Sequence, residues 1–352
     1  MIGYGVIGCG RIADRHISSI AKLSEGRIFA LCDIRAERME QVEQEYRKIS
    51  GSAQKIAHYQ DIAGILADER VQAVVIATHS AMHAEIAKAA LERGKHVMVE
   101  KPLALSAEEA ENLVRLAESS GLQLQVCHQL RYKPVMRRIK EIIESGAMGK
   151  VHLGVASMRL QRNEAYYEAA RWRGTWDQDG GMLLNQGIHL VDLLGWFLGE
   201  YESVYGILTR GPLPKQTEDF AVGLIRFKNG AVGMIEANTL TYPNSMDNSI
   251  ALFGEQGTVW ISGINLNTVR RWSFSDSSIT CPDMDGIDEH FVMHEKFLQA
   301  IKGIQSGIVN GREGKKALEL VFALYDSFRT NQVTKGPITT FSTTMMSDLE
   351  GW

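Results

Sequence analysis

The chain has 352 residues, about twice the length of a ~150-residue domain, so we expect two domains with substantial buried cores. With 45% hydrophobic and 23% charged residues and only seven prolines, it has the composition of a globular protein and not of a disordered or fibrous one. The formal net charge of −4 provides no general attraction to nucleic acid or anionic lipid, so neither is an expected partner.

Cysteine usage and the N-terminal segment bear on the cellular compartment. The four cysteines, Cys9, Cys32, Cys127 and Cys281, lie far apart and include no C-x-x-C pair, which argues against a disulfide framework and a zinc knuckle. The first residues lack a basic region followed by a long apolar stretch, and no run reaches the ~18 apolar residues of a membrane span. We therefore expect a protein of the reducing cytoplasm.

Residues 1–128 alternate short apolar runs with longer helical patterns, which is typical of successive βαβ units. Ser106 and Glu109 form a capping box at the start of the last helical pattern. The expected strands are 2–7, 27–32, 71–77, 96–99 and 123–127, and the expected helices are 11–22, 35–48, 82–92 and 106–119. The pattern predicts an α/β fold that begins with a doubly wound parallel sheet, a dinucleotide-binding Rossmann domain.

Residues 129–352 follow a different pattern. A helix-bearing connector over 129–150 leads into alternating strands. Asn229-Gly230 predicts a tight hairpin turn, because both of these residues tolerate positive φ. The expected strands are 151–160, 203–210, 219–227, 231–240, 249–254 and 258–263, and helices are expected over about 287–305 and 312–330. We predict an α+β domain with a large, mostly antiparallel open sheet. Its uncovered face favours a homodimer or homotetramer.

A phosphate-binding motif follows the first strand directly. The residues Gly8-Cys9-Gly10-Arg11-Ile12-Ala13 form G-x-G-x-x-A, in which Gly8 permits the tight turn and Gly10 lets the backbone approach a pyrophosphate. The second strand ends in Asp33, where a carboxylate accepts hydrogen bonds from the ribose hydroxyls and repels a 2′-phosphate. We therefore predict NAD as cofactor, bound by Gly8, Gly10, Arg11, Ile12 and Asp33, with NADP the less favoured alternative.

Two alternatives remain open at this motif. The glycines could merely form a tight loop while Asp33 caps the next helix. Arg35, which we also include among the cofactor-binding residues, could stack on adenine in an NAD enzyme or bind a 2′-phosphate in an enzyme of dual specificity.

A lysine follows the strand 96–99, in the sequence Glu100-Lys101-Pro102. It lies at the carboxyl end of a predicted parallel strand, which is the edge where open α/β sheets bind ligands. The ordinary alternative is a solvated lysine after a strand.

The segment GKHVMVEKPLALSAEEA resembles the E-K-P segment of the Gfo/Idh/MocA family of oxidoreductases. The resemblance extends over nearly the whole chain. It includes the segments GVIGCGRIADRH, ATHSAMHAEIAKAAL, CHQLRYKP, WRGTW, GGMLLNQGIHLVDLLGWFLG, TEDFAVGLIRFKNGAVG and ALELVFALYDSF. The resemblance implies a nicotinamide cofactor held between a Rossmann domain and a mixed-sheet domain, and oxidation of a sugar or cyclitol hydroxyl.

The resemblance also implies roles for individual residues. Lys101 would lie within reach of the reacting hydroxyl and stabilise the developing alkoxide, which suits an ammonium group in a dry cleft. Arg131 and Tyr132 would lie near the substrate. The residues implied to line the cofactor are Thr78, His79, His83, Glu100, Lys101 and Gln129. His83 could alternatively cap its helix.

Asn185 and His189 are spaced four residues apart, so they share one face if the helix runs through Gly187. Many relatives have D-x-G-x-H here, whereas this chain has Asn185 in place of the aspartate, and an amide cannot take a proton. His189 is therefore our candidate general base, Lys101 its electrostatic partner, and Asn185 a hydrogen-bonding group for the substrate. The alternative is a structural histidine on an amphipathic helix.

The asparagine form, together with WRGTW and the upstream glycines, is similar to the branch of nucleotide-sugar 3-dehydrogenases that act on UDP-N-acetylglucosaminuronate. This similarity suggests C3 of a nucleotide-linked or anionic pyranose as the oxidised carbon. An inositol or free-hexose dehydrogenase remains an alternative, as does a catalytically idle NAD-binding sensor. A third possibility is an enzyme that never releases its cofactor and regenerates it with a second sugar.

The remaining candidates have weaker patterns. Trp172 and Arg173 could cover the nicotinamide end of the cofactor, or the loop could simply pack on the sheet. An anionic sugar could be bound by a set of arginines, Arg131, Arg159, Arg162, Arg171 and Arg173, although Arg159 and Arg162 should point to opposite faces of a strand. His290 and His294 form an H-x-x-x-H pair on an ordinary helix pattern, and we expect no metal site there.

Overall fold

The computed structural model describes residues 1–284, 286–347 and 349, and this chain divides into two compact units. The first unit contains Met1–Ala104, Glu109–Tyr132 and Ile287–Lys315. The second contains Leu105–Glu108, Lys133–Gly286 and the chain from Lys316 onward. Among the described residues, no helix has both the length and the apolar character that crossing a bilayer requires.

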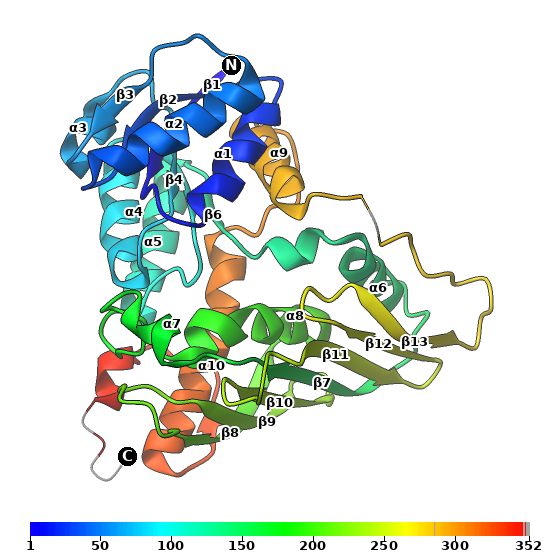
Figure 1. Cartoon of the computed structure of the whole chain (residues 1–352). Helices are drawn as coiled ribbons and strands as arrows, with labels where there is room; N and C mark the ends of the chain where they lie inside the picture. The colour runs from blue at the N-terminus through cyan, green and yellow to red at the C-terminus, as the bar shows by residue number, and fades with distance from the viewer. Residues whose placement is uncertain (285, 348, 350–352) are drawn as a thin grey trace. The chain divides into compact units, whose positions relative to one another are not determined.

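A six-stranded, all-parallel sheet forms the centre of the first unit, in the order β3-β2-β1-β4-β5-β6 (Figure 1). The strands are β1 (Ile2–Ile7), β2 (Gly26–Cys32), β3 (Ala57–Tyr59), β4 (Ala73–Ile76), β5 (His96–Val99) and β6 (Leu124–Val126). The order reverses between β1 and β4, so the carboxyl ends of these two strands border the crevice where doubly wound sheets bind ligands. The predicted doubly wound sheet is confirmed.

Helices cover this sheet because their apolar faces and the aliphatic strands bury one another. They are α1 (Ala13–Lys22), α2 (Ala36–Ser50), α3 (Ile62–Ala67), α4 (His83–Glu92), α5 (Ala107–Ser120) and α9 (Glu289–Ile301), with short 3₁₀ turns over Ser80–Met82 and Gln129–Tyr132. Helix α9 returns from late in the sequence and packs against α1 (Figure 1), where Met293 and Phe297 enter the core. The prediction missed α3 and β3, because such short segments show too little periodicity.

An eight-stranded sheet forms the second unit, in the order β13-β12-β11-β7-β10-β9-β8-β14. The strands are β7 (Val151–Arg159), β8 (Tyr201–Thr209), β9 (Phe220–Phe227), β10 (Val232–Asn238), β11 (Asp247–Gly254), β12 (Gly257–Ser262), β13 (Thr268–Phe274) and β14 (Thr334–Lys335). Only β7 and β10 pair in parallel among these described strands. The large, mostly antiparallel sheet is thus confirmed, while β13 and β14 were not predicted.

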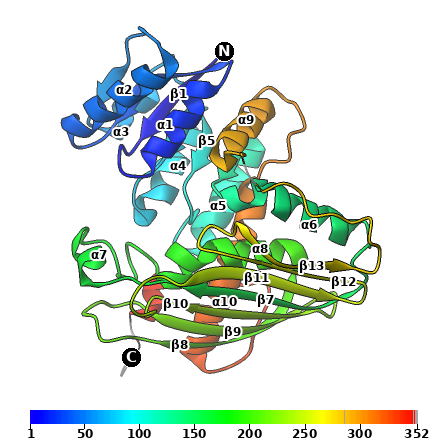
Figure 2. The ribbon, with the colours of Figure 1, turned by 45° about the vertical axis from the view of Figure 1, so that its right-hand side comes forward.

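One face of the second sheet is covered by α8 (Ile188–Leu198) and by the later turns of α10 (Gly311–Thr330) (Figure 2). Gly206 and Gly223 let α10 approach closely, because a Cβ at either position would come within 2.7 Å of an atom of Leu324. The other helical segments of this unit are α6 (Pro134–Glu144), α7 (Glu164–Glu168), the π-helix Leu183–Gly187 and a 3₁₀ turn over Thr343–Met346.

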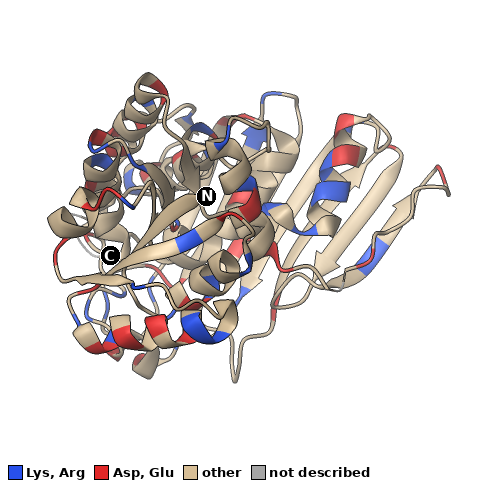
Figure 3. Cartoon of the chain, turned by 90° about the horizontal axis from the view of Figure 1, so that it is seen from above, with Lys and Arg blue, Asp and Glu red and all other residues tan. Residues whose placement is uncertain are grey.

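The opposite face of this sheet carries large apolar side chains that are exposed to solvent. The cross-strand register places Leu224 opposite Met234, and Ala251 opposite Trp260. The large exposed apolar residues of this face include Ile207, Leu224, Val232, Met234, Phe253 and Trp260. Outside such patches, charged residues of both signs are intermixed along the helices (Figure 3).

The β9–β10 hairpin forms where Asn229-Gly230 predicts it, but with a different turn. Gly230 has a φ of 86°, whereas Asn229 is not among the residues with positive φ. The N–H of Gly230 donates to the carbonyl of Phe227 (2.9 Å) and that of Phe227 to the carbonyl of Ala231 (2.9 Å). This is a type I turn closed by a glycine bulge. The Asn229 side chain donates to the carbonyl of Leu198, an interaction that lies outside the hairpin.

Candidate active site

The glycine turn after β1 contains two glycines with different roles. Gly8 has a φ of 92°, and a Cβ there would lie 2.7 Å from the backbone of Ala77 after β4. Gly8 is therefore required by the fold itself. Around the Cβ position of Gly10, by contrast, no described atom lies within 4 Å. A depression of about 520 Å³ lies here, lined in part by Gly10, Arg11 and Arg38.

Asp33 at the end of β2 is held against this turn. One carboxylate oxygen accepts from the N–H of Cys9 (2.8 Å) and the other from the N–H of Arg35 (2.9 Å). A carboxylate has about four lone-pair positions, so each oxygen can accept a further hydrogen bond. Ile34 and Arg35 beside it are exposed. Asp33 therefore ties the glycine turn to the end of β2 and keeps capacity for a ribose hydroxyl. Its other bond reaches only Arg35, the residue before α2, and not the N–H groups inside that helix.

The loop after β4 contains Thr78, His79 and His83. Thr78 and His79 are half-buried, whereas His83 is almost fully buried. The ring nitrogens of His83 face the carbonyl oxygens of Pro102 (2.7 Å) and Thr78 (3.1 Å). Burial lowers the pKa of His83, so a neutral ring donates to one of these carbonyls. His83 thereby connects the loop after β4 to the turn that contains Lys101.

Glu100 fixes the backbone on which Lys101 is presented. Its carboxylate accepts from Nε2 of His16 (2.9 Å) and from the N–H of Lys101 (3.3 Å). Nδ1 of His16 in turn shares a hydrogen bond with Nε2 of His294 on α9 (2.9 Å). Burial alone would raise the pKa of Glu100, but the His16 hydrogen bond and the nearby charge of Lys101 outweigh it and lower this pKa to about 2. Glu100 is thus a buried carboxylate that stays ionised.

This His294–His16–Glu100 chain was not predicted. In the sequence, His294 stood out only as one half of the H-x-x-x-H pair. The other half, His290, also lies edge-on to His16, with 6.3 Å between the ring centroids. Sγ of Cys127 lies within 4.8 Å of the His16 and Glu100 ligand atoms. Burial raises the pKa of this thiol well above its usual value, so it stays protonated and is a poor metal ligand.

The segment after β6 contains three further predicted residues. Gln129 is half-buried. Arg131 is buried and pairs with Glu313 (3.2 Å), and the hydroxyl of Tyr132 accepts from the N–H of Val309 (3.2 Å). These contacts hold the start of α10 against the sheet. The roles of the three residues toward ligands stay predictions.

In the second unit, Asn185 and His189 lie on consecutive helical segments of different type. Asn185 is in the π-helix Leu183–Gly187, and His189 is in the first turn of α8. The helix therefore runs through Gly187, which is the condition for Asn185 and His189 to share one face. The wider π turn, however, changes the angular offset between the two side chains. Single π turns inside α-helices are frequent at functional sites.

Two buried carboxylates hold this π-helix. The amide nitrogen of Asn185 donates to Oδ1 of Asp179, whose Oδ2 accepts from the N–H of Gly174 (2.8 Å). Oε1 of Glu218 accepts from the N–H of Leu183 (2.8 Å) and from the hydroxyl of Tyr325 (2.6 Å). Burial raises the pKa of Glu218 to about 7. Neither carboxylate was predicted, although Asp179 directly precedes Gly180 and Gly181 in the sequence.

Trp172 and Arg173 lie in the loop that precedes these glycines and are half-buried. The Arg173 guanidinium carbon lies 5.4 Å from the Trp172 ring centroid and 4.1 Å from that of Tyr166. The loop therefore has an internal aromatic and cationic packing of its own.

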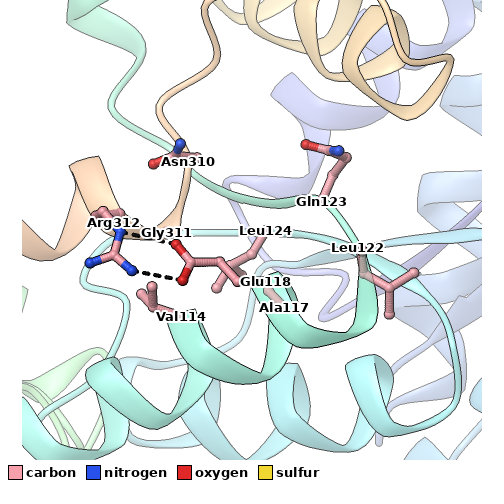
Figure 4. Close-up of a pocket in the computed structure, with 10 residues that line it drawn as sticks. Val114, Ala117, Glu118, Leu122, Gln123, Leu124, Asn310, Gly311 and Arg312 are labelled. Carbon is pink, nitrogen blue, oxygen red and sulfur yellow. Dashed lines mark hydrogen bonds and ion pairs between the residues drawn. The ribbon is translucent and has the colours of Figure 1, made fainter.

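A separate pocket of about 250 Å³ lies between the end of α5 and the start of α10 (Figure 4). Its two charged residues, Glu118 and Arg312, form a bidentate ion pair (2.9 and 2.7 Å). None of the residues predicted from the sequence to bind a ligand lines it. The pair neutralises this pocket, so it offers no unpaired charge to a ligand.

Comparison with known proteins identifies the family. Residues 2–128 match the oxidoreductase family with an NAD-binding Rossmann fold, and residues 136–260 match the GFO/IDH/MocA C-terminal domain. The solved structure of the WlbA dehydrogenase from Bordetella pertussis, in complex with NADH and UDP-GlcNAcA, is 31% identical, with a TM-score of 0.87 over 96% of this chain and 98% of that one. The chain belongs to the Gfo/Idh/MocA family of oxidoreductases.

Curated relatives within the Gfo/Idh/MocA family include cyclitol dehydrogenases. The myo-inositol 2-dehydrogenase of Thermotoga maritima is 25% identical over 94% of this chain and 97% of its own length. The scyllo-inositol 2-dehydrogenase (NAD(+)) of Bacillus subtilis is 27% identical over 92% of this chain and 93% of its own length.

The glycine turn fits the NAD expected of this family. The open space at Gly10 is where a pyrophosphate would approach the backbone at the start of α1, and the Asp33 carboxylate lies beside it. Nothing in the packing of the described residues requires glycine at position 10, whereas a ligand at the helix N-terminus would. The residues present therefore fit NAD.

Proposed function

We propose that this protein is an NAD-dependent dehydrogenase that oxidises a secondary hydroxyl of a sugar or sugar derivative. The observation that carries the proposal is Lys101, which follows β5 at the carboxyl edge of the Rossmann sheet on a turn fixed by ionised Glu100. An ammonium group at this edge suits the stabilisation of negative charge that develops on a reacting oxygen.

The two family matches suggest a separate function for each part of the chain. We propose that residues 1–128 bind the dinucleotide and that residues 129–352 bind the substrate and form the oligomer interface. NAD, when bound, accepts the hydride. In addition to the glycine turn and Asp33, which disfavours a 2′-phosphate, the proposed cofactor ligands are Ile12, Arg35, Thr78, His79, His83, Glu100, Gln129, Trp172 and Arg173.

Three residues carry the proposed chemistry. His189 removes the hydroxyl proton, because an imidazole is the side chain best suited to act as a general base near neutral pH. Lys101 polarises the same hydroxyl and stabilises the alkoxide. Asn185, whose amide nitrogen donates to Asp179, is the proposed hydrogen-bonding group for the substrate. Arg131 and Tyr132 are further proposed substrate contacts.

The likeness to the WlbA dehydrogenase favours C3 of a nucleotide-linked, acidic pyranose as the reacting position. A cyclitol or free hexose is the second candidate, supported by the inositol dehydrogenases among the relatives. Initial rates of NADH formation, measured with UDP-sugars, free hexoses, sugar phosphates and inositols, distinguish these candidates. Failure of every member of the panel to reduce NAD would refute the proposal and favour an NAD-binding sensor.

Release of the cofactor needs a separate measurement. We expect added NAD to support multiple turnovers and the NADH formed to exchange into solution. If NADH stays bound and is oxidised only by a second sugar, the enzyme belongs to the cofactor-retaining type.

We also propose that the protein is a homodimer or homotetramer of the cytoplasm. The exposed apolar face of the second sheet supports self-association, and Cys9, Cys32 and Cys127, buried as free thiols, suit a reducing compartment. Leu224→Glu on that face should reduce the mass measured by light scattering. Ile304→Glu, an exposed apolar site in the first unit, is the matched control and should leave the mass unchanged.

A further inference from the structure

The candidate anion-binding arginines differ in whether a carboxylate of the protein pairs with them. Arg131 pairs with Glu313 and Arg159 with Glu236 (2.7 Å), so each of these charges is compensated within the protein. Glu236 lies on the exposed apolar face of the second sheet, which places Arg159 there as well. Neither of these two arginines therefore needs an anion from outside the chain to balance its charge.

Arg162 and Arg173 have no such compensation. No carboxylate of the described chain lies within ion-pair distance of either guanidinium. In both, Nε is buried and lacks a hydrogen-bond partner among the described residues. Two half-buried cations without a carboxylate partner are suited to bind an anionic group from outside the chain.

Both guanidinium groups are held in place by the same tyrosine. Their central carbons lie 4.9 Å (Arg162) and 4.1 Å (Arg173) from the centroid of the Tyr166 ring. Each also donates one N–H to a backbone carbonyl, Arg162 to Gln161 (2.8 Å) and Arg173 to Tyr166 (2.6 Å). Stacking and the carbonyl contact fix the plane of each guanidinium group. The second terminal nitrogen of each has no hydrogen-bond partner among the described residues.

A hydrogen bond connects this arginine pair to the π-helix of the candidate site. The hydroxyl of Tyr166 accepts from Nε2 of Gln186 (2.9 Å), and Gln186 follows Asn185 directly. Tyr166, Gln186 and both arginines belong to the second unit, so this arrangement is internal to one compact body. The cationic pair is thus anchored to the segment that we propose to bind the substrate.

We propose that Arg162 and Arg173 form an anion site that binds the carboxylate or phosphate group of an acidic sugar substrate. This inference rests on the proposed function, because it assigns the substrate class of that site. Arginine is suited to planar oxyanions, since its N–H groups match two oxygens at once. In this assignment Arg173 contacts the substrate instead of the cofactor, and Tyr166 positions both arginines.

The test compares four ligands that separate the two sources of charge. Glucose has neither group, glucuronate has a sugar carboxylate, UDP-glucose has a diphosphate, and UDP-glucuronate has both. Dissociation constants are measured by calorimetry on NAD-loaded protein, which requires no turnover. Arg162→Leu and Arg173→Leu each lose a charged hydrogen bond to the anionic group. Both variants should therefore bind the ligand that carries this group at least about tenfold more weakly than the wild type.

The pattern over the four ligands decides the outcome. If the variants weaken glucuronate relative to glucose, the site binds the sugar carboxylate, and if they weaken UDP-glucose relative to glucose, it binds the diphosphate. Arg173→Lys keeps the positive charge but lacks the planar guanidinium group. Its affinity for the affected ligands should lie between those of the wild type and Arg173→Leu. The control is Arg271→Leu, an exposed arginine on β13 with no proposed contact to a ligand, which should change none of the affinities.

Two results would overturn the inference, and they are distinguishable. If wild-type protein binds the acidic ligands but the arginine variants bind them equally well, with circular dichroism showing them folded, the arginines have only a packing role. In that case the proposed function stands. If wild-type protein binds no ligand of the panel, the proposed substrate class fails together with the anion site.

Discussion

Replacing Glu100 with glutamine should measure how strongly the buried network holds the turn that contains Lys101. The pKa of Glu100 is lowered from its ordinary 4.5 to about 2, and each pKa unit corresponds to 1.36 kcal/mol. The ionised carboxylate therefore contributes about 3 kcal/mol to the free energy of unfolding at neutral pH. Glu100→Gln has nearly the same shape but no charge, so it should lose about this amount.

The sign of the pH dependence follows from the lowered pKa. A carboxylate whose pKa is lower in the folded state stabilises the protein above the unfolded-state pKa, and this contribution disappears as the pH falls toward the folded-state value. The difference in unfolding free energy between wild type and Glu100→Gln should be constant above about pH 5.5 and fall to less than half at pH 3.

Urea unfolding followed by circular dichroism at a series of pH values gives this difference directly. The control is Glu118→Gln, which removes the exposed ion pair with Arg312 and should change stability little. The reasoning about Glu100 is wrong if the variant is as stable as wild type at pH 7. It is also wrong if the difference between the two proteins does not shrink below pH 4.5.

Three further predictions concern the catalytic groups and the glycine turn. His189→Ala should lower kcat at pH 7 by about 10²- to 10⁴-fold, and an unchanged kcat would exclude it as general base. In Asp179→Asn the new amide NH2 group faces another donor, either the Asn185 amide or the N–H of Gly174, so one of these two hydrogen bonds is lost. We expect kcat/KM to fall about tenfold while its pH profile stays unchanged. Gly8→Ala should lower the melting temperature, because its Cβ would meet backbone, whereas Gly10→Val should leave melting unchanged and weaken NAD binding in calorimetry.

The sequence by itself determined the features that depend on residues close together in the chain. The runs of buried aliphatic residues defined β1 and β5 to the residue, and the glycine motif followed by Asp33 predicted the dinucleotide site. Lys101 was predicted as a site residue from the strand before it and from the E-K-P resemblance, and its role stays a prediction. Such patterns are local because strand periodicity and turn conformation are set by neighbouring residues.

Only the tertiary structure showed which distant side chains share a hydrogen bond or an uncompensated charge. His16 and His294 are 278 positions apart, and no pattern in either helix indicates that their rings meet above Glu100. The arginines look alike in the sequence, yet the fold gives a carboxylate to Arg159 and none to Arg162. Burial and pairing depend on which elements pack together in space, and that is decided by the whole core and not by the local sequence.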